Sequence, residues 1–232
     1  MTAENTYFEG WHDDLFSKDQ AIYETLGDVT RGLVRGNVLD LGCGSRVYYN
    51  TSEVDRWVGL DLSQNLLDKI EFIGEAPPKG PIERVLGDCT ALNFPDGSFD
   101  TVCTIFLLHH LGRTNRKESR LAIEKALAES YRVLRKGGIM LIAESWPLKL
   151  LHVYNLLFPL LYPLAKRLAN VEVPCFFTAG SYEKMAIRAG FKRTHLLSAD
   201  LYEDAIWPVL NLKIPGWTQR LTHKYGIYIL VK

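Results

Sequence analysis

The stretch Val38-Leu39-Asp40-Leu41-Gly42-Cys43-Gly44 decides the fold of this chain. Here an apolar run leads into an acid and two closely spaced glycines, and a second apolar run, Trp57-Val58-Gly59-Leu60-Asp61, also ends in an acid. Runs of this kind are typical of buried parallel strands. We therefore expect the two acids at the ends of adjacent strands, where glycines let the backbone approach a ligand and an acid accepts hydrogen bonds from ribose hydroxyls.

The glycine spacing separates two classes of cofactor. A dinucleotide site requires Gly-x-Gly-x-x-Gly, but the position three after Gly44 is Val47, which disfavours a nicotinamide or flavin. Asp40 adds a carboxylate that would repel a pyrophosphate but orient an ammonium group, directly or through water. This combination favours S-adenosylmethionine, held by Asp40, Gly42, Gly44 and Asp61.

Five further segments extend the pattern along the chain. They are G-L-D-L-S at 59–63, L-G-D-C-T-A-L-N-F-P-D-G-S-F-D-T-V at 86–102, I-F-L-L-H-H-L at 105–111, E-S-Y-R-V-L-R-K-G-G at 129–138 and I-M-L-I-A-E at 139–144. In this order and spacing, residues 33–145 resemble the class I S-adenosylmethionine-dependent methyltransferases of the small-molecule type. The resemblance implies an α/β fold with a Rossmann-like, doubly wound, seven-stranded, mostly parallel sheet and an antiparallel C-terminal edge hairpin.

Strand and helix patterns alternate, which indicates right-handed crossovers and a parallel sheet covered on both faces. Ser63 is a candidate N-cap, and the pair Gly137 and Gly138 is a candidate helix stop. The predicted strands are 38–41, 57–61, 84–86, 100–105, 139–144, 192–199 and 225–231, and the predicted helices are 63–72, 117–135 and 181–189.

The resemblance also implies cofactor contacts beyond the glycine loop. Asp88 would accept a hydrogen bond from the exocyclic amine of adenine, and the backbone amide of Cys89 would donate to a ring nitrogen. Leu62 would pack on the adenine face, and Thr104 lies where the family's backbone touches the methionine portion.

Two adjacent histidines follow the strand predicted at 100–105, at the end of the sheet where the reactive ends of ligands gather. One of them could act as the general base that removes a proton from a hydroxyl or a protonated amine. Of the two candidates, His109 and His110, we favour His110. The alternative is a structural or substrate-orienting role, because related proteins carry this pair without base chemistry.

One residue departs from the family pattern. The family usually places a third glycine two residues after the second, and this chain has Arg46 there. Arg46 is expected to reach over the cofactor or the substrate, and the alternatives are a solvated loop arginine and impaired cofactor binding.

The aromatic and acidic N-terminal segment, about 1–30, predicts a helical lid over the cofactor. In this lid the Tyr7 hydroxyl would reach the methionine carboxylate and the Trp11 indole would stack on the substrate. The alternative is that both aromatic side chains only pack in the core.

A largely apolar segment at about 146–177 lies outside the shared pattern. Its prolines and polar residues interrupt it too often for a transmembrane helix. By resemblance it forms a cap over the substrate pocket, with Trp146 and His152 as substrate-binding candidates. The alternatives are packing on the sheet, a dimer interface, or an interfacial helix in peripheral contact with a membrane.

Composition narrows the class of protein. The chain has 232 residues, 47% of them hydrophobic, and 27 Lys plus Arg balance 27 Asp plus Glu. These values predict one domain over 1–232, without electrostatic attraction to nucleic acid. The resemblance implies that it is a methyltransferase domain, and we expect a monomer or homodimer. Four cysteines without a Cys-x-x-Cys pair, and an N-terminus without a signal-peptide pattern, indicate a reduced, cytoplasmic protein with no metal site.

The leading hypothesis is therefore methyl transfer to a hydroxyl, amine or carboxylate of a small apolar or aromatic metabolite. A protein or RNA methyltransferase is the first alternative, although the neutral charge and the absence of an Asn-Pro-Pro-Tyr pattern after Thr104 argue against it. The second alternative is a non-catalytic binding protein that uses the apolar insertion as a partner surface. The three retained acids Asp40, Asp61 and Asp88 argue against that alternative.

Overall fold

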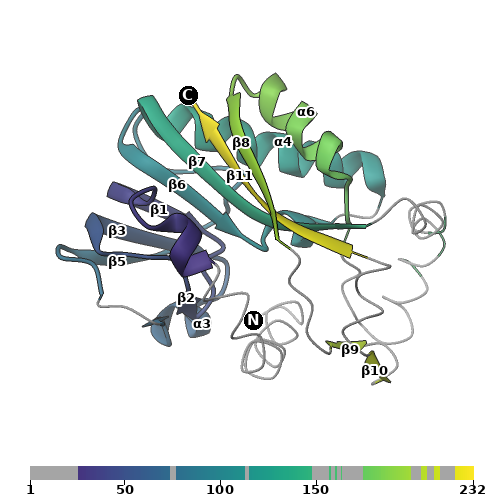
Figure 1. Cartoon of the computed structure of the whole chain (residues 1–232), viewed down its shortest axis with the longest axis horizontal. Coiled ribbons are helices and arrows are strands. Elements are labelled where there is room, and N and C mark those ends of the chain that lie inside the picture. The colour runs from purple at the N-terminus through teal and green to yellow at the C-terminus, as the bar shows by residue number, and fades with distance from the viewer. Residues whose placement is uncertain are drawn as a thin grey trace.

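The structure is a computed structural model that describes residues 26–73, 77–112, 115–147, 157, 160, 163, 175–199, 205–207, 212–214 and 223–232. Figure 1 shows these residues in colour, arranged around one twisted sheet. The predicted lid at 1–30, apart from a helical turn at 26–30, and most of the predicted cap at 146–177 lie outside the described residues.

The sheet has seven strands in the order β5-β3-β1-β6-β7-β11-β8. The first five of these run parallel to one another, whereas β11 is antiparallel to both β7 and β8. This confirms the predicted Rossmann-like sheet with its antiparallel C-terminal edge. The strands are β1 (Arg35–Leu41), β3 (Glu53–Asp61), β5 (Ile82–Leu86), β6 (Phe99–Ile105), β7 (Leu134–Pro147), β8 (Lys192–Ala199) and β11 (His223–Val231). A separate two-stranded sheet pairs β9 (Ala205–Trp207) with β10 (Leu212–Ile214).

One face of the sheet is covered by α4 (Arg116–Val133) and α6 (Ala179–Arg188), which pack on each other and lie near β8 in Figure 1, with α4 also contacting β7. Asn115 and Thr178 cap the two helices by accepting hydrogen bonds from the Glu118 and Ser181 amides. The strand residues alternate between two cores, as the period of a strand requires. Leu39, Met140 and Ile142 pack in the cluster beneath α4 and α6, and Val38, Cys103 and Leu141 pack on the other face.

The first crossover contains no helix. A parallel crossover is usually made by a helix, but residues 42–52 connect β1 to β3 through a loop with one short strand, β2 (Arg46–Val47). The loop buries Val47, Tyr48 and Tyr49 on the sheet, next to Trp57. These side chains supply the apolar cover that a crossover helix would otherwise provide.

Two boundary predictions were wrong. The helix predicted from Ser63 to 72 is only α3 (Gln64–Asp68), because β4 (Glu71–Phe72) pairs with β2, and the Glu71 amide donates to the Ser45 carbonyl at 2.9 Å. Gly137 and Gly138 lie within β7, after α4 has already ended at Val133. A Cβ on Gly138 would lie 2.9 Å from the Arg135 carbonyl oxygen and 3.0 Å from the Asp100 carbonyl oxygen, so glycine is needed for this close approach of backbone groups.

Candidate active site

The glycine loop leaves β1 with two residues in the left-handed region, Gly42 at φ 61° and Gly44 at φ 60°. The amides of Gly42 and Cys43 donate to the Leu60 carbonyl at 2.7 and 3.2 Å, which ties the loop to the end of β3. A Cβ at Gly42 would overlap the side chain of Leu107, from the loop after β6. Glycine is therefore favoured here by its left-handed conformation, and a larger residue would also have to displace the Leu107 side chain.

Asp61 at the end of β3 holds the loop from the other side. Its Oδ2 accepts from the Gly44 amide and its Oδ1 from the Ser63 amide, each at 2.9 Å. Burial raises the pKa of Asp61, and hydrogen bonds from backbone amides oppose the rise. Three backbone amides, of Ser63, Gly44 and Leu62, act on a carboxylate with about four lone-pair sites, so the side chain can also accept from a ribose hydroxyl, as the sequence predicts.

Asp40 lies at the carboxyl end of β1 and is only 2% exposed. The Tyr49 hydroxyl donates to its Oδ2 at 2.9 Å, and Trp57 Nε1 donates to the Tyr49 oxygen at 2.6 Å. Burial raises the pKa of Asp40 to about 7, with the Tyr49 hydrogen bond opposing and the charge of Asp61 adding to the rise. Oδ1 has no hydrogen-bond partner among the described residues, so an ammonium group at this position would satisfy a buried acceptor.

The residues predicted to contact adenine follow the ends of β3 and β5. Leu62 is 62% exposed, Cys89 is buried, and Asp88 is exposed with its Oδ1 accepting from the Thr90 amide at 2.8 Å. Leu86, which is 58% exposed and paired in register with Asp61, was not predicted as a site residue. The sequence could have indicated Leu86 as a site residue, because it ends β5 directly before Gly87 and Asp88.

The loop after β6 is strained where it leaves the sheet. Phe106 has φ 52°, in the left-handed region that non-glycine residues rarely adopt, and its amide donates to the Ala143 carbonyl at 2.8 Å. This turn places Leu107 against Gly42 and leads into the short helix η1 (Leu108–His110). Thr104, just before the turn, is buried, and its hydroxyl has no hydrogen-bond partner in the described part of the chain.

The two histidines of η1 have different surroundings. His109 is buried, and its Nδ1 lies 2.6 Å from Oε1 of Glu144, while its amide donates to Oε2 of Glu144 at 3.1 Å. Its ring stacks on Phe176 at 4.9 Å between centroids, and the exposed His110 ring lies 4.0 Å away.

Glu144 is fully buried at the carboxyl end of β7 and also accepts from the Ser145 amide at 2.9 Å. It was missed as a site residue, although an acid closing the run 139–144 was a visible signal.

Four predicted substrate or lid residues have little or no structural description. Tyr7, Trp11 and His152 lie outside the described residues, and for Trp146 only the backbone in β7, opposite Lys224, is described. Arg46 lies half-buried in β2, in register with Glu71 of β4.

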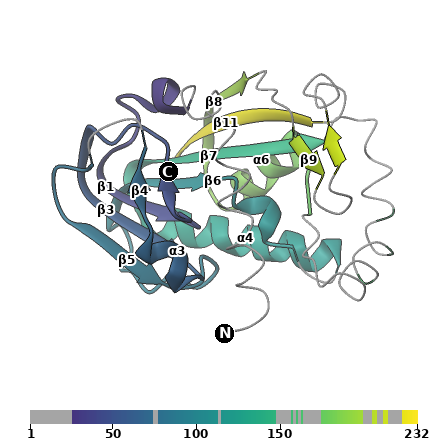
Figure 2. The same cartoon turned by 90° about the horizontal axis from the view of Figure 1, so that it is seen from below.

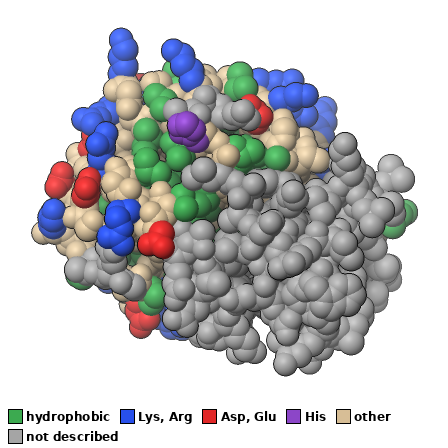
Figure 3. Space-filling model, in the orientation of Figure 1, with side chains coloured by type: hydrophobic (Ala, Val, Ile, Leu, Met, Phe, Trp, Pro, Cys, Tyr) green, Lys and Arg blue, Asp and Glu red, His purple; other side chains and the backbone are tan. Residues whose placement is uncertain are grey.

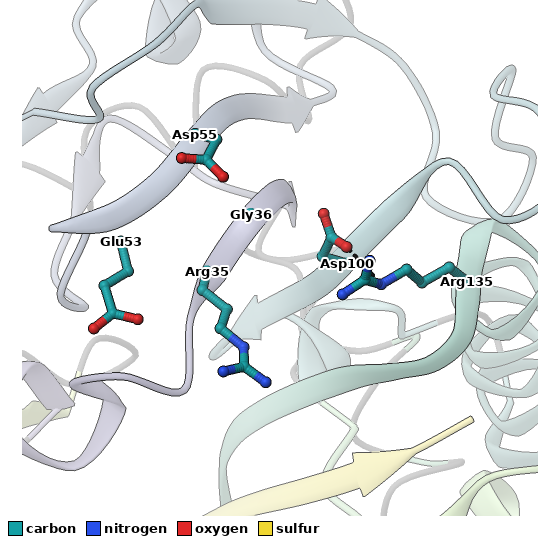
Figure 4. A pocket seen from close by; sticks show the side chains of 6 residues that line it. All are labelled: Arg35, Gly36, Glu53, Asp55, Asp100 and Arg135. Atoms are coloured by element: carbon teal, nitrogen blue, oxygen red, sulfur yellow. Dashed lines mark ion pairs between the residues drawn. The ribbon is translucent and has the colours of Figure 1, made fainter.

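A hollow of about 360 Å³ lies at the opposite end of the sheet (Figure 4). It is lined by residues at or near the amino ends of four strands: Arg35, Gly36, Glu53, Asp55, Asp100 and Arg135. Its charges are already balanced in part, since Arg135 forms an ion pair with Asp100. Ligands of open α/β sheets bind at the carboxyl ends of the strands, so the glycine loop and not this hollow is the candidate active site.

Comparison with known proteins agrees with this geometry. A family model described as a methyltransferase domain matches residues 39–142, from β1 to β7. Residues 39–142 are a class I methyltransferase domain. The cofactor of this domain is S-adenosylmethionine, and the buried Asp40 acceptor, the paired glycines and Asp61 fit it.

Two solved structures share the fold of this methyltransferase domain and its flanking elements. The cyclopropane synthase MmaA2 of Mycobacterium tuberculosis has a TM-score of 0.59 and 15% identity, covering 88% of this chain and 82% of that one. The mycolic acid cyclopropane synthase CmaA1, complexed with SAH and CTAB, has a TM-score of 0.57 and 16% identity over the same shares of both chains.

Two curated relatives are similar in sequence. A tRNA (carboxymethyluridine(34)-5-O)-methyltransferase of Xenopus tropicalis is 31% identical over 146 residues, which are 61% of this chain and 21% of that protein. The ubiquinone/menaquinone biosynthesis C-methyltransferase UbiE of Methylobacterium nodulans is 43% identical over 65 residues, 28% of this chain and 22% of that protein. The chain thus spans about a fifth of the length of either relative. Within the described ranges, no helix has the length and apolar character needed to cross a membrane.

Proposed function

We propose that this chain transfers the methyl group of S-adenosylmethionine to a hydroxyl, amine or carboxylate of a small apolar or aromatic molecule. The observation that carries the proposal is the position of His109, fixed by buried Glu144 and stacked on Phe176, on the loop that contacts the cofactor glycines through Leu107. A candidate base, an aromatic wall and the cofactor loop thus meet at one end of the sheet.

The geometry of this pair favours His109 over His110 as the base. Nδ1 of His109 faces the buried Glu144 carboxylate, so the Nδ1 proton is donated there and Nε2 is left as the basic nitrogen. A base of this kind contributes typically about 10² to 10⁴ in rate.

The reaction itself is a displacement in which the cofactor supplies an electrophilic methyl carbon on a sulfonium. With the cofactor held at the glycine loop, His109 Nε2 would take the proton from a hydroxyl or ammonium acceptor, whereas a carboxylate acceptor would need no base. Alignment is the larger contribution, up to roughly 7 to 11 kcal/mol when the reacting atoms are well placed. In this proposal Gly42, Leu107 and Asp61 provide that alignment by fixing the loop between β1 and η1.

Three observations support an apolar small molecule as the acceptor. Phe176 offers an apolar ring beside the base, the segment 146–177 is largely aliphatic and aromatic, and a quinone methyltransferase is among the relatives. In Figure 3 the described basic side chains are spread along the upper and left sides of the molecule, and acidic side chains lie among them, so the described part of this face shows no basic patch of one sign.

A second candidate acceptor is transfer RNA, because the relative that aligns with 61% of this chain is a tRNA methyltransferase. One experiment separates the two acceptors. Purified protein is incubated with methyl-labelled cofactor and either total tRNA or a panel containing a phenol, a hydroquinone and a fatty acid. Label in the organic extract supports the proposal, and label in acid-precipitable RNA overturns it. Asp61→Ala, which removes the loop anchor and the ribose acceptor, controls for activity of a contaminating enzyme.

A further inference from the structure

Three buried polar groups form a chain behind the cofactor loop. They are the Asp40 carboxylate at the end of β1, the Tyr49 hydroxyl from the loop 42–52, and the Trp57 indole in β3. All three residues are at most 2% exposed.

We infer that Tyr49 is a positioning residue for the cofactor: it holds Oδ2 of Asp40 so that Oδ1 receives the cofactor's ammonium group, and cofactor binding is thereby coupled to release of a proton from Asp40. The coupling concerns the cofactor alone, so it holds for either methyl acceptor considered above.

The direction of the hydrogen bonds in this chain is fixed by the chemistry of its members. An indole nitrogen can only donate, so the Tyr49 oxygen accepts from Trp57 at 2.6 Å and its own proton is directed to the Asp40 carboxylate at 2.9 Å, with the Cys103 thiol as a weaker neighbouring acceptor. Burial raises the pKa of Tyr49 well above its ordinary value, so this proton stays in place. Oδ2 of Asp40 therefore always has a donor, and Oδ1, which has none among the described residues, is the oxygen available to a ligand.

The surroundings of Asp40 make its proton sensitive to a cation. The titratable groups that act on it in the described chain are Tyr49, Asp61, Cys43 and Cys103, and none of them is a cation. With nothing positive to offset burial, the pKa of Asp40 rises to about 7. An ammonium group at Oδ1 favours the charged carboxylate and lowers this pKa, so binding at or below neutral pH displaces the proton.

The loop that replaces the crossover helix makes this arrangement possible. Residues 46–47 pair with β4, and Tyr49, which follows them, is buried on the sheet and reaches Asp40. The departure from a glycine-rich loop thus supplies the donor that orients Asp40.

The test measures cofactor affinity and proton release by titration calorimetry on the purified full chain, without any methyl acceptor. Wild-type protein should bind S-adenosylmethionine about sevenfold more weakly at pH 6.0 than at pH 7.2, as expected for a carboxyl with a pKa near 7. Apparent enthalpies in two buffers with different enthalpies of ionisation should show release of about 0.7 proton at pH 6.5, as follows from the same pKa. Asp40→Asn should bind weakly, without pH dependence and without proton release.

Tyr49→Phe tests the positioning role, and Tyr48→Phe, which removes a buried hydroxyl from the neighbouring residue, is its matched control. Without the Tyr49 hydrogen bond, Asp40 should hold its proton to higher pH. In Tyr49→Phe, cofactor affinity should therefore begin to fall at a higher pH than in wild type. Tyr48→Phe should show the same dependence of affinity on pH as wild type. If Tyr49→Phe does not fold, Trp57→Phe, which removes the donor that directs the Tyr49 proton, replaces it.

Two results overturn the inference. One is wild-type affinity that is equal at both pH values with no proton released, which would separate Asp40 from cofactor binding. The other is a Tyr49→Phe affinity that is uniformly lower with the wild-type pH dependence intact, which would reduce Tyr49 to a packing residue. A wild-type protein that binds no cofactor at either pH overturns the site as a whole, and this outcome is distinct from failure to methylate a particular acceptor.

Discussion

At the scale of single residues, the contacts that matter most join positions far apart in the sequence. Glu144 and His109 are separated by 35 residues, and the hydrogen bond between them exists only because β7 follows β6 in the sheet. A sequence pattern can indicate that two histidines lie near the cofactor. It cannot tell which of them faces a buried carboxylate, and for that reason the sequence favoured His110 and the geometry favours His109.

This distinction predicts unequal effects of two substitutions on turnover. His109→Gln should lower kcat by about 10² to 10⁴ because it removes the base. His110→Gln, at an exposed ring, should lower it by less than tenfold. Methyl transfer to an active acceptor is measured at saturating cofactor, with calorimetry to check that the cofactor dissociation constant stays within about threefold in both variants. A larger loss of kcat in His110→Gln than in His109→Gln would indicate that His110 is the general base.

Asp40 makes a prediction about stability in the absence of cofactor. Its pKa is about 7 in the folded protein against 3.8 for the ordinary carboxyl. Between these values the folded state binds a proton that the unfolded state has lost. The stabilisation is therefore complete below about pH 4 and is lost as pH rises to 7, by at most about 1.4 kcal/mol per pH unit.

Asp40→Asn should remove this slope. Urea unfolding of the ligand-free protein at pH 5, 6, 7 and 8 should show wild type losing stability relative to the variant up to pH 7, then a constant difference. The comparison with wild type cancels the contribution of Asp61, whose pKa is also raised. A difference between the two proteins that is the same at every pH would show that Asp40 is ionised throughout.

At the scale of elements, the strands of the sheet were predictable because buried parallel strands leave continuous apolar runs. The predicted runs at 38–41, 57–61 and 100–105 all lie within observed strands. The loop 42–52 and α3 were not predictable in the same way. The end of α3 is decided by the pairing of β4 with β2, and two-residue strands leave no periodicity to read.

The short β2–β4 ladder predicts a contrast between two substitutions at one position. Glu71→Pro removes the amide that donates to Ser45 and should lower the free energy of unfolding by about 1 to 3 kcal/mol. Glu71→Ala keeps that amide and, as a surface change, should stay within about 0.5 kcal/mol of wild type. Both are measured by urea unfolding, and equal losses would mean that the side chain, not the ladder, matters at residue 71.

At the scale of the whole molecule, the sheet separates two ends with different roles. The carboxyl ends of β1, β3, β6 and β7 bring together the glycine loop, Asp61, His109 and Glu144, whereas the amino ends form the hollow of Figure 4. If chemistry is confined to the carboxyl ends, a defect at the hollow should weaken the fold without changing the cofactor site.

Gly36→Ala tests this separation. Gly36 has φ 70°, and a Cβ there would overlap the Asp100 carboxylate, which accepts from the Asn37 amide at 2.7 Å and pairs with Arg135. The strained backbone and the displaced ion pair should cost about 1 to 3 kcal/mol of unfolding free energy. Calorimetry on the folded fraction should nevertheless give a wild-type dissociation constant for S-adenosylmethionine, because β1 carries the substitution at one end and the ligand at the other. A change of more than about fivefold in that constant, with the fold intact by circular dichroism, would show that the two ends are coupled through β1.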